Sequence, residues 1–146
     1  MLRRAVPEDL DALVRLVEEF YEVDRYPFDE ALVRGALLGL LEGDEHGVAW
    51  LVVGPGCADE ALGYAVVTWG YSIESGGREG LVDEFFVRER NGGVGSAALV
   101  SVLEACRAYG PRRLFLETEA RNDAARRFYA RHGFDADDSI WMSRTL

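Results

Sequence analysis

The stretch 82-VDEFFVRERNGGVGSAALVSVLEACRA-108 joins an apolar run to an amphipathic segment through two arginines and three glycines. The apolar run predicts a strand that is covered on both faces. Beyond the glycines, apolar side chains recur at the spacing of one helix face: Leu99, Val102, Leu103 and Cys106. Glycines between a strand and a helix let backbone N–H groups approach an anion, and the helix dipole adds to the attraction. The stretch therefore predicts a phosphate-binding turn.

Two well-known phosphate loops do not fit this turn. A Walker-type loop needs a lysine after its last glycine, whereas Ser96 follows Gly95 here and all 16 basic residues of the chain are arginine. Gly93, Gly95 and Ala98 match a dinucleotide-binding fingerprint. A dinucleotide fold begins at that fingerprint, however, and needs further strand-helix units after it, for which too little chain remains. Neither function is expected.

The composition sets the class of protein. The chain has 146 residues, of which 49% are hydrophobic, which predicts a single domain over 1–146. It has no apolar run of signal-peptide or membrane-spanning length, so we expect a cytoplasmic protein without a membrane partner. The net charge of −10 argues against nucleic acid and favours a cationic partner. Cys57 and Cys106 lack metal-ligand spacing, so no metal is expected.

The other segments predict a mixed α/β fold, with a mixed sheet and helices on both faces. Helices are expected over 7–23, between Asp29 and Gly43, from about Ser96, and over 122–132, with Asn122 as a cap and Gly133 as the stop. Strands are expected over 2–6, 46–53, 61–71, 81–87, 112–118 and 139–146.

A second pattern follows the glycine turn by about 30 residues. It reads NxxAxxFYxxxGF and consists of Asn122, Ala125, Phe128, Tyr129, Gly133 and Phe134. Together with R/QxxGxG/A at Arg90, Gly93 and Gly95, it makes nearly the whole chain resemble the GCN5-related N-acetyltransferases (GNAT), closest in layout to the branch of diamine and aminoglycoside acetyltransferases. The resemblance implies a mostly antiparallel sheet splayed between its fourth and fifth strands, and often a homodimer.

The resemblance also implies acetyl-CoA as co-substrate and direct attack on it by a primary amine. Backbone N–H groups from Asn91 to Ser96 would hold the pyrophosphate, and Phe86, Val87 and Asn122 would meet the pantetheine and acetyl groups. The implied acetyl-CoA residues are Phe86, Val87, Arg88, Arg90, Asn91, Gly92, Gly93, Val94, Gly95, Ser96, Asn122 and Tyr129. Only Arg88 and Glu89 separate Val87 from Arg90, fewer than in most members, which leaves open which arginine faces the anion.

Four residues are candidates for proton transfer: Tyr129, Asp83, Glu84 and Glu117. The resemblance assigns Tyr129 to protonating the departing thiolate. An amine with a pKa of about 10.4 is neutral only about one part in 2,500 at pH 7, so a base or a path to water is useful. Strand alternation predicts that Asp83 and Glu84 cannot both face the same cleft. Diamine acetyltransferases, which have a similar acidic pair, place the first acid, here Asp83, on the acceptor side. Ribosomal-protein acetyltransferases have a working acid at the position of Glu117. All three acids therefore stay open as the base.

The acceptor is expected to meet an acidic and aromatic wall. The residues expected in it are Tyr21, Tyr26, Trp69, Tyr71 and Asp83. Such a wall suits an ammonium group through charge and cation–π attraction, which favours a small cationic amine such as a polyamine or an aminoglycoside. Two alternatives stay open: a non-catalytic acetyl-CoA sensor, and an acetyltransferase of protein N-termini or lysines.

Overall fold

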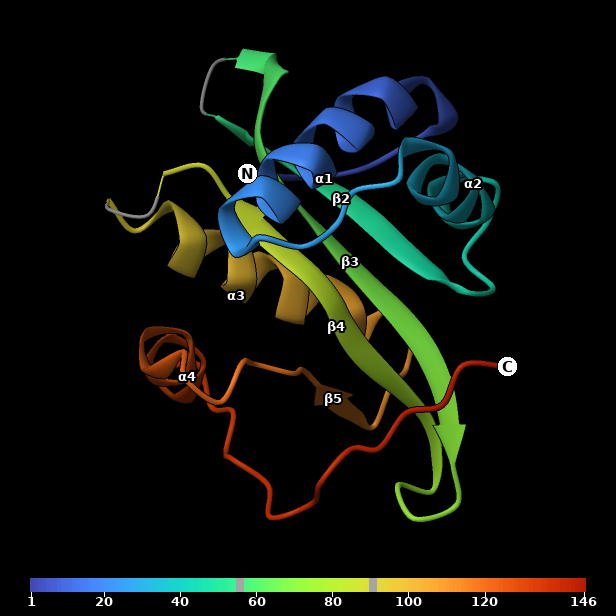
Figure 1. Cartoon of the computed structure of the whole chain (residues 1–146), viewed down its shortest axis with the longest axis vertical. Coiled ribbons are helices and arrows are strands. Elements are labelled where there is room, and N and C mark those ends of the chain that lie inside the picture. Colours follow the sequence, from blue (N-terminus) through green and yellow to red (C-terminus); the bar gives the residue numbers. More distant parts are fainter. Residues whose placement is uncertain (55–56, 90–91) are drawn as a thin grey trace.

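The computed structural model describes residues 1–54, 57–89 and 92–146 of the chain (Figure 1). The described strands are β1 (Leu2–Arg4), β2 (Gly47–Gly54), β3 (Cys57–Ser72), β4 (Gly77–Val87) and β5 (Arg113–Phe115). The helices are α1 (Leu10–Asp24), which follows a 3₁₀ turn at Pro7–Asp9, and α2 (Glu30–Leu41), α3 (Val94–Arg107) and α4 (Asp123–Ala130).

The strands form one mixed sheet in the order β1-β2-β3-β4-β5. All neighbouring pairs are antiparallel except β4 and β5, which are parallel. The parallel pairing covers only three positions and ends where Leu81 faces Phe115. Beyond that point β4 continues to Val87 while β5 has ended. The structure thus confirms a mostly antiparallel sheet whose fourth and fifth strands splay apart.

Helices cover both faces of the sheet (Figure 1). On one face, α1 and α2 pack against apolar side chains such as Leu51 and Val66. On the other face, Val102 and Cys106 of α3 pack against Val48, Val67 and Val82. Successive side chains of β2 and β3 therefore pack alternately into the two cores on opposite faces of the sheet. This explains why every residue of β2 is buried. Burial raises the pKa of the Cys106 thiol to about 11.

Local signals in the sequence fix the helix ends as expected. The carboxylate of Asp29 accepts a hydrogen bond from the backbone N–H of Leu32 at 3.1 Å, and Asn122 Oδ1 accepts one from Ala125 N–H at 3.0 Å. Both are N-caps that satisfy a first-turn donor. Gly133 has φ 88°, the left-handed conformation that ends a helix.

Two expected elements differ in the structure. Residues 139–146 form no strand, although their alternation is strand-like, because they have no hydrogen-bonded neighbour strand. The strand expected over 112–118 is reduced to Arg113–Phe115, since the chain leaves β4 after Phe115. Helix α4 is regular as far as Ala130, and hydrogen bonds from Gly133 N–H to Ala130 and from Phe134 N–H to Tyr129 complete its last turn at the expected stop. Periodicity identifies a strand's side-chain pattern but not whether a partner strand is available.

Within the described ranges, no helix combines the length and the apolar character needed to cross a membrane. Helix α1, with 15 residues, has buried side chains on one side only, including Leu13 and Val17. Its other side is charged, so it is a surface helix.

Candidate active site

A cleft of about 840 Å³ opens where β4 and β5 separate. The end of α1 and the loop after it contribute Tyr21, Asp24 and Tyr26. Strand β4 contributes residues 83–87, and the segment from β5 through α4 contributes Glu117, Asn122 and Tyr129. Clefts of this size hold small-molecule ligands in many proteins. Residues far apart in the sequence are thus gathered at the point where the sheet is split.

A β-bulge in β4 determines how the acids enter this cleft. Val66 of β3 pairs with Glu84 and Val67 pairs with Val82, so Asp83 is an extra residue without a partner. A bulge shifts the alternation by one position and re-aims the side chains that follow. As a result Asp83 and Glu84 both line the cleft, and the expectation that they could not is wrong.

Glu84 is held by two tyrosines. Its carboxylate accepts a hydrogen bond from Tyr21 Oη and another from Tyr64 Oη, each at 2.5 Å. Burial raises the pKa of Glu84, and the two hydrogen bonds oppose that rise only in part. Burial also raises the pKa of Tyr21 and Tyr64 well above the usual value, so both phenols remain donors. Glu84 therefore ties α1 to the sheet at the wall of the cleft.

Asp83 has a different environment. Burial raises the pKa of its carboxyl group, as for Glu84. Within the described part of the chain, however, no side chain donates a hydrogen bond to it, and it is the more exposed of the two acids. A carboxylate with free lone pairs and a raised pKa is suited to accepting a proton near neutral pH.

Tyr129 projects from α4 and forms part of the opposite wall. Its ring packs edge-on against Phe128 and Phe134, with centroids 5.1 and 5.8 Å apart. Burial, with a smaller effect of the Asp24 carboxylate, raises the pKa of Tyr129 to about 12, so the phenol keeps its proton at physiological pH. No residue of the described segments bonds to its hydroxyl, which leaves the O–H available to a ligand.

The glycine turn leads into the first turn of α3. Gly92 and Gly93 have φ of 118° and 80°, which side chains other than glycine rarely adopt. No side chain of the described residues caps α3, so none of them satisfies the first-turn N–H groups of Val94, Gly95 and Ser96. The Ser96 hydroxyl lies 3.1 Å from His132 Nε2, so its side chain is directed toward α4. Arg90 and Asn91, assigned to acetyl-CoA from the sequence, lie outside the described residues.

Arg88 points away from the glycine turn. Its guanidinium makes a bidentate ion pair with Glu19 of α1, at 2.6 and 2.7 Å, and donates a further hydrogen bond to the carbonyl of Ala61. The carboxylate holds the pKa of Arg88 above its usual value. Phe86 and Val87, by contrast, line the cleft on the side of β4 that β5 leaves free.

Only some of the aromatic residues that the sequence predicts for the acceptor site line the cleft. Tyr21 and Tyr26 line the cleft, and Tyr26 donates a hydrogen bond to Glu119 at 2.9 Å. Trp69 instead stacks on Tyr109 with centroids 5.3 Å apart, outside the cleft, and Tyr71 is exposed near the end of β3. Both residues lie toward the far end of β3, opposite Gly80 and Arg78 of β4, where β4 has not yet separated from β5.

Carboxylates dominate the cleft electrostatically. Among the described residues, one arginine, Arg131, and six carboxylates line it: Asp24, Asp83, Glu84, Glu89, Glu117 and Glu119. Sequence reasoning did not single out Glu89 and Glu119, which lie in the loops after β4 and β5, or the buried Tyr64 of β3, which bonds to Glu84. Within 1–54, 57–89 and 92–146, no group of three or more His, Cys, Asp and Glu side chains is arranged to hold a metal ion.

Residues 10–134 match the acetyltransferase (GNAT) family, and the chain belongs to that family. It is therefore an acyltransferase, and the family uses acetyl-CoA as the acetyl donor. No curated protein matches the chain significantly in sequence.

Solved structures agree with this assignment. The integron cassette protein HFX_CASS3 from the mobile metagenome of Cole Harbour Salt Marsh is 35% identical over 99% of this chain and 90% of that chain, with a TM-score of 0.86. A candidate acetyltransferase from Arthrobacter sp. FB24 is 26% identical, covering 100% and 96%, with a TM-score of 0.83. An aminoglycoside acetyltransferase, meta-AAC0020, from an uncultured soil sample and in complex with sisomicin, is 15% identical, covers 100% and 95%, has a TM-score of 0.78, and shares the fold.

Proposed function

We propose that this acetyltransferase transfers the acetyl group of acetyl-CoA to a primary amine of a small cationic acceptor. The observation that carries the proposal is the excess of carboxylates in the cleft, where the described lining residues include six acids and one arginine. Like charges that converge on a concave, partly desolvated surface concentrate ligands of the opposite sign. Tyr21 and Tyr26 add aromatic faces on which an ammonium group can rest.

The opposite end of the cleft suits the anionic part of acetyl-CoA. At the start of α3, which no described side chain caps, the first-turn N–H groups follow two glycines in the left-handed region and can cradle a pyrophosphate. Because Arg88 is paired with Glu19, we assign the neighbouring cation to Arg90. The free edge of β4 at Phe86 and Val87 offers backbone groups to the pantetheine chain, beside Asn122.

Proton removal from the acceptor is the step that needs a base. Holding an alkylammonium group in its neutral form at pH 7 costs about 4.6 kcal/mol for a pKa of about 10.4. Among the three candidate acids we assign this role to Asp83, because no described side chain donates a hydrogen bond to its carboxylate, whereas that of Glu84 accepts two. The neutral nitrogen then attacks the thioester carbonyl and forms the new C–N bond, the C–S bond breaks, and the nitrogen passes its extra proton to water or to the departing sulfur, so that the N-acetyl amide and CoA are released.

We assign to Tyr129 the role of hydrogen-bond donor to the departing sulfur of CoA. Its O–H is directed at the cleft and stays protonated because burial raises its pKa to about 12. Complete proton transfer from such a phenol to a thiolate, whose thiol has a pKa near 8.5, is uphill. The phenol therefore acts best as a hydrogen-bond donor that stabilises the sulfur as negative charge develops on it.

The test of the proposed function is release of free CoA thiol from acetyl-CoA in the presence of a panel of amines. The panel contains polyamines, aminoglycosides, amino acids and peptides with a free N-terminus or a lysine. We expect turnover with the polycationic amines, and a KM for them that rises with ionic strength because salt screens the acidic cleft. Turnover with peptides alone would identify a protein N-terminus or lysine as the acceptor. Binding of acetyl-CoA without turnover of any amine would favour a non-catalytic sensor.

Asp83→Asn should lower kcat/KM for the best amine about tenfold at pH 7. The effect is limited because water can partly replace the base. Since burial raises the pKa of Asp83, the lower limb of the pH profile should be displaced or lost in this variant. Glu117→Gln is the matched comparison across the cleft. A larger loss in that variant than in Asp83→Asn would transfer the role of base to Glu117.

A further inference from the structure

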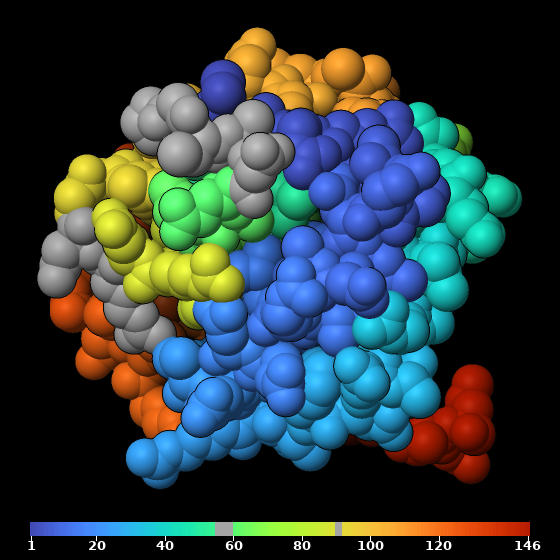
Figure 2. All heavy atoms as spheres, turned by 90° about the horizontal axis from the view of Figure 1, so that it is seen from above, coloured from blue at the N-terminus to red at the C-terminus, as the bar shows by residue number. Residues whose placement is uncertain are grey.

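Helix α4 carries Tyr129 but is attached to the rest of the fold through few contacts. It has eight residues, and none of them is buried. The chain is irregular between the end of β5 and Asn122 apart from a short turn, and residues 135–146 form no helix or strand. In Figure 2 the orange-red atoms of the region around α4 lie at the rim of the molecule. The position of Tyr129 therefore depends on the few side chains that connect α4 to its neighbours.

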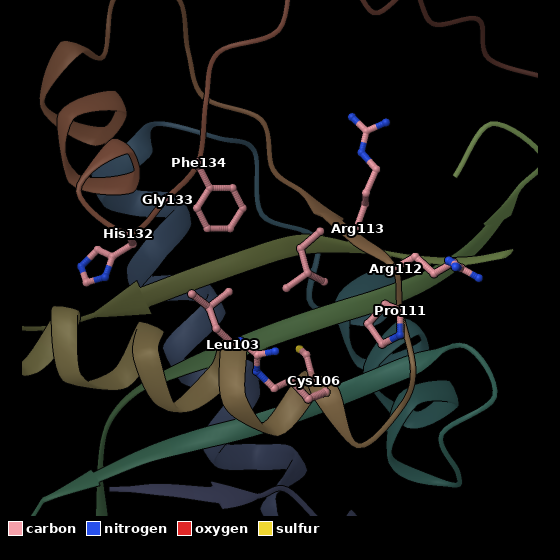
Figure 3. Close-up of a pocket in the computed structure, with 10 residues that line it drawn as sticks. Leu103, Cys106, Pro111, Arg112, Arg113, His132, Gly133 and Phe134 are labelled. Atoms are coloured by element: carbon pink, nitrogen blue, oxygen red, sulfur yellow. The ribbon is translucent and has the colours of Figure 1, made fainter. Parts of the chain in front are cut away.

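Contacts with β4 and with α3 hold this helix in place. The ring of Phe128 stacks on that of Phe85 in β4, with centroids 6.2 Å apart. His132, in the last turn of α4, has its Nε2 3.1 Å from the hydroxyl oxygen of Ser96 in α3. Figure 3 shows the His132 ring projecting from the end of α4 toward α3. Among the described residues, this is the only side-chain hydrogen bond that joins residues 123–134 to another helix or strand.

The His132 ring is closely linked to its own helix. It packs against Phe128 with centroids 5.0 Å apart, and the backbone N–H of His132 donates to the carbonyl of Tyr129 at 2.9 Å. The imidazole therefore cannot move relative to α3 without moving the last turn of α4. A serine hydroxyl can donate to an imidazole nitrogen or accept from it, so the bond to Ser96 can form with either neutral tautomer and with the protonated ring.

This hydrogen bond joins two parts of the site that must act on the same molecule. Ser96 belongs to the first turn of α3, whose N–H groups we assign to the pyrophosphate of acetyl-CoA. Tyr129 is assigned to the sulfur, at the other end of the pantetheine chain. The separation between the start of α3 and the Tyr129 hydroxyl must therefore match the length of the bound molecule. A misplacement of about 1 Å in a reacting group can lower a rate about 100-fold.

We propose that His132 is a positioning residue for acetyl transfer. Its hydrogen bond with Ser96 holds α4, and with it Tyr129, in register with the helix start that binds the pyrophosphate. His132 lines the pocket of about 300 Å³ between α3 and β5 shown in Figure 3 and not the cleft, so it acts through Tyr129. Because the proposal rests on the proposed function, its test includes a measurement that needs no turnover.

The kinetic test compares His132→Ala with His132→Gln. His132→Ala should lower kcat for the best amine about tenfold and change the Kd for acetyl-CoA less than about twofold, since Tyr129 is displaced while the N–H groups of α3 remain. His132→Gln offers an amide at a similar reach to Ser96 and should recover most of the lost kcat. Release of CoA and equilibrium binding of acetyl-CoA measure the two quantities.

Two further variants separate positioning from a general structural effect. In a Tyr129→Phe background, His132→Ala should lower kcat less than about twofold further, because the hydroxyl that it positions is already absent. His46→Ala changes the other histidine of the chain, which is exposed before β2, and should leave kcat and Kd unaltered. Normal kcat in His132→Ala would overturn the proposal. So would a tenfold loss that recurs in the Tyr129→Phe background or that His132→Gln does not relieve.

Hydrogen exchange of the backbone amides of residues 126–134 tests the link without an acceptor amine. Saturating acetyl-CoA should slow this exchange at least about threefold in the unaltered chain and in His46→Ala, but not in His132→Ala or Ser96→Ala. Equal slowing in all four proteins would overturn the proposal. If no amine is turned over, the proposed function fails, whereas loss of the slowing in His132→Ala and Ser96→Ala would still support the link between α3 and α4.

Discussion

Replacing Tyr129 with phenylalanine should lower kcat at least about 100-fold while leaving the Kd for acetyl-CoA nearly unchanged. The substitution removes only the hydroxyl group that we propose stabilises the leaving sulfur, and donation to a developing anion contributes about this much to a rate. The ring still packs against Phe128 and Phe134, so the fold should be retained. Steady-state release of CoA and equilibrium binding of acetyl-CoA measure the two quantities separately.

Tyr109→Phe is the control for this substitution. Tyr109 packs against Trp50 and Trp69, outside the cleft, so loss of its hydroxyl should not affect turnover. Normal turnover in Tyr129→Phe would show that the thiolate leaves without help from this phenol. A parallel loss of acetyl-CoA binding would instead assign Tyr129 to holding the co-substrate.

The second large effect is expected on stability at Glu84. Glu84→Leu would leave the hydroxyl groups of Tyr21 and Tyr64 without their acceptor, and Tyr64 is completely buried. An unsatisfied buried donor costs about 1–3 kcal/mol, so the free energy of unfolding should fall by about 2–5 kcal/mol, as measured by urea denaturation at pH 7. Glu84→Gln keeps an acceptor and should cost less. Equal losses in the two variants would show that packing, and not hydrogen bonding, matters at this position.

The effect of Glu84→Gln on the free energy of unfolding should depend on pH. Burial raises the pKa of Glu84 in the folded state, so folding favours its protonated form. Its contribution to stability is therefore fully present below the ordinary pKa of 4.5 and is lost as the pH rises through the folded-state value. Glutamine carries no charge, so the unfolding free energy of Glu84→Gln should shift upward relative to that of the unaltered protein as the pH rises above 4.5. Glu104→Gln, on the exposed side of α3, is the control and should show no such gain.

Most of the fold follows from local sequence signals. The caps at Asp29 and Asn122, the stop at Gly133 and the hairpin of β2 and β3 were all predictable, because each depends on residues close together in the chain. The tail at 139–146 was not, since a strand exists only where another strand accepts its hydrogen bonds. The alternation of apolar residues shows which face of a segment can be buried. Whether that segment becomes a strand depends on a neighbouring strand that the tertiary structure must supply.

The candidate site was predictable to a similar degree. Its motif residues, including Tyr129 and Asn122, meet in one cleft, because the two motifs bracket the split in the sheet. Trp69 and Tyr71 do not reach it, and Tyr64 was missed. These errors share one cause, since they concern strand residues whose direction depends on register, which a single sequence does not specify.

The bulge at Asp83 can be removed without disturbing the two cores. Val82 and its partner Val67 pack on the side of α3, whereas Val66, the partner of Glu84, and Phe86 pack on the side of α1. Because Val82 and Glu84 already lie on opposite faces, a chain lacking residue 83 would pair without interruption and keep Glu84 and Phe86 on the side of α1. The deletion would therefore take one carboxylate out of the cleft and leave the rest of the strand as it is.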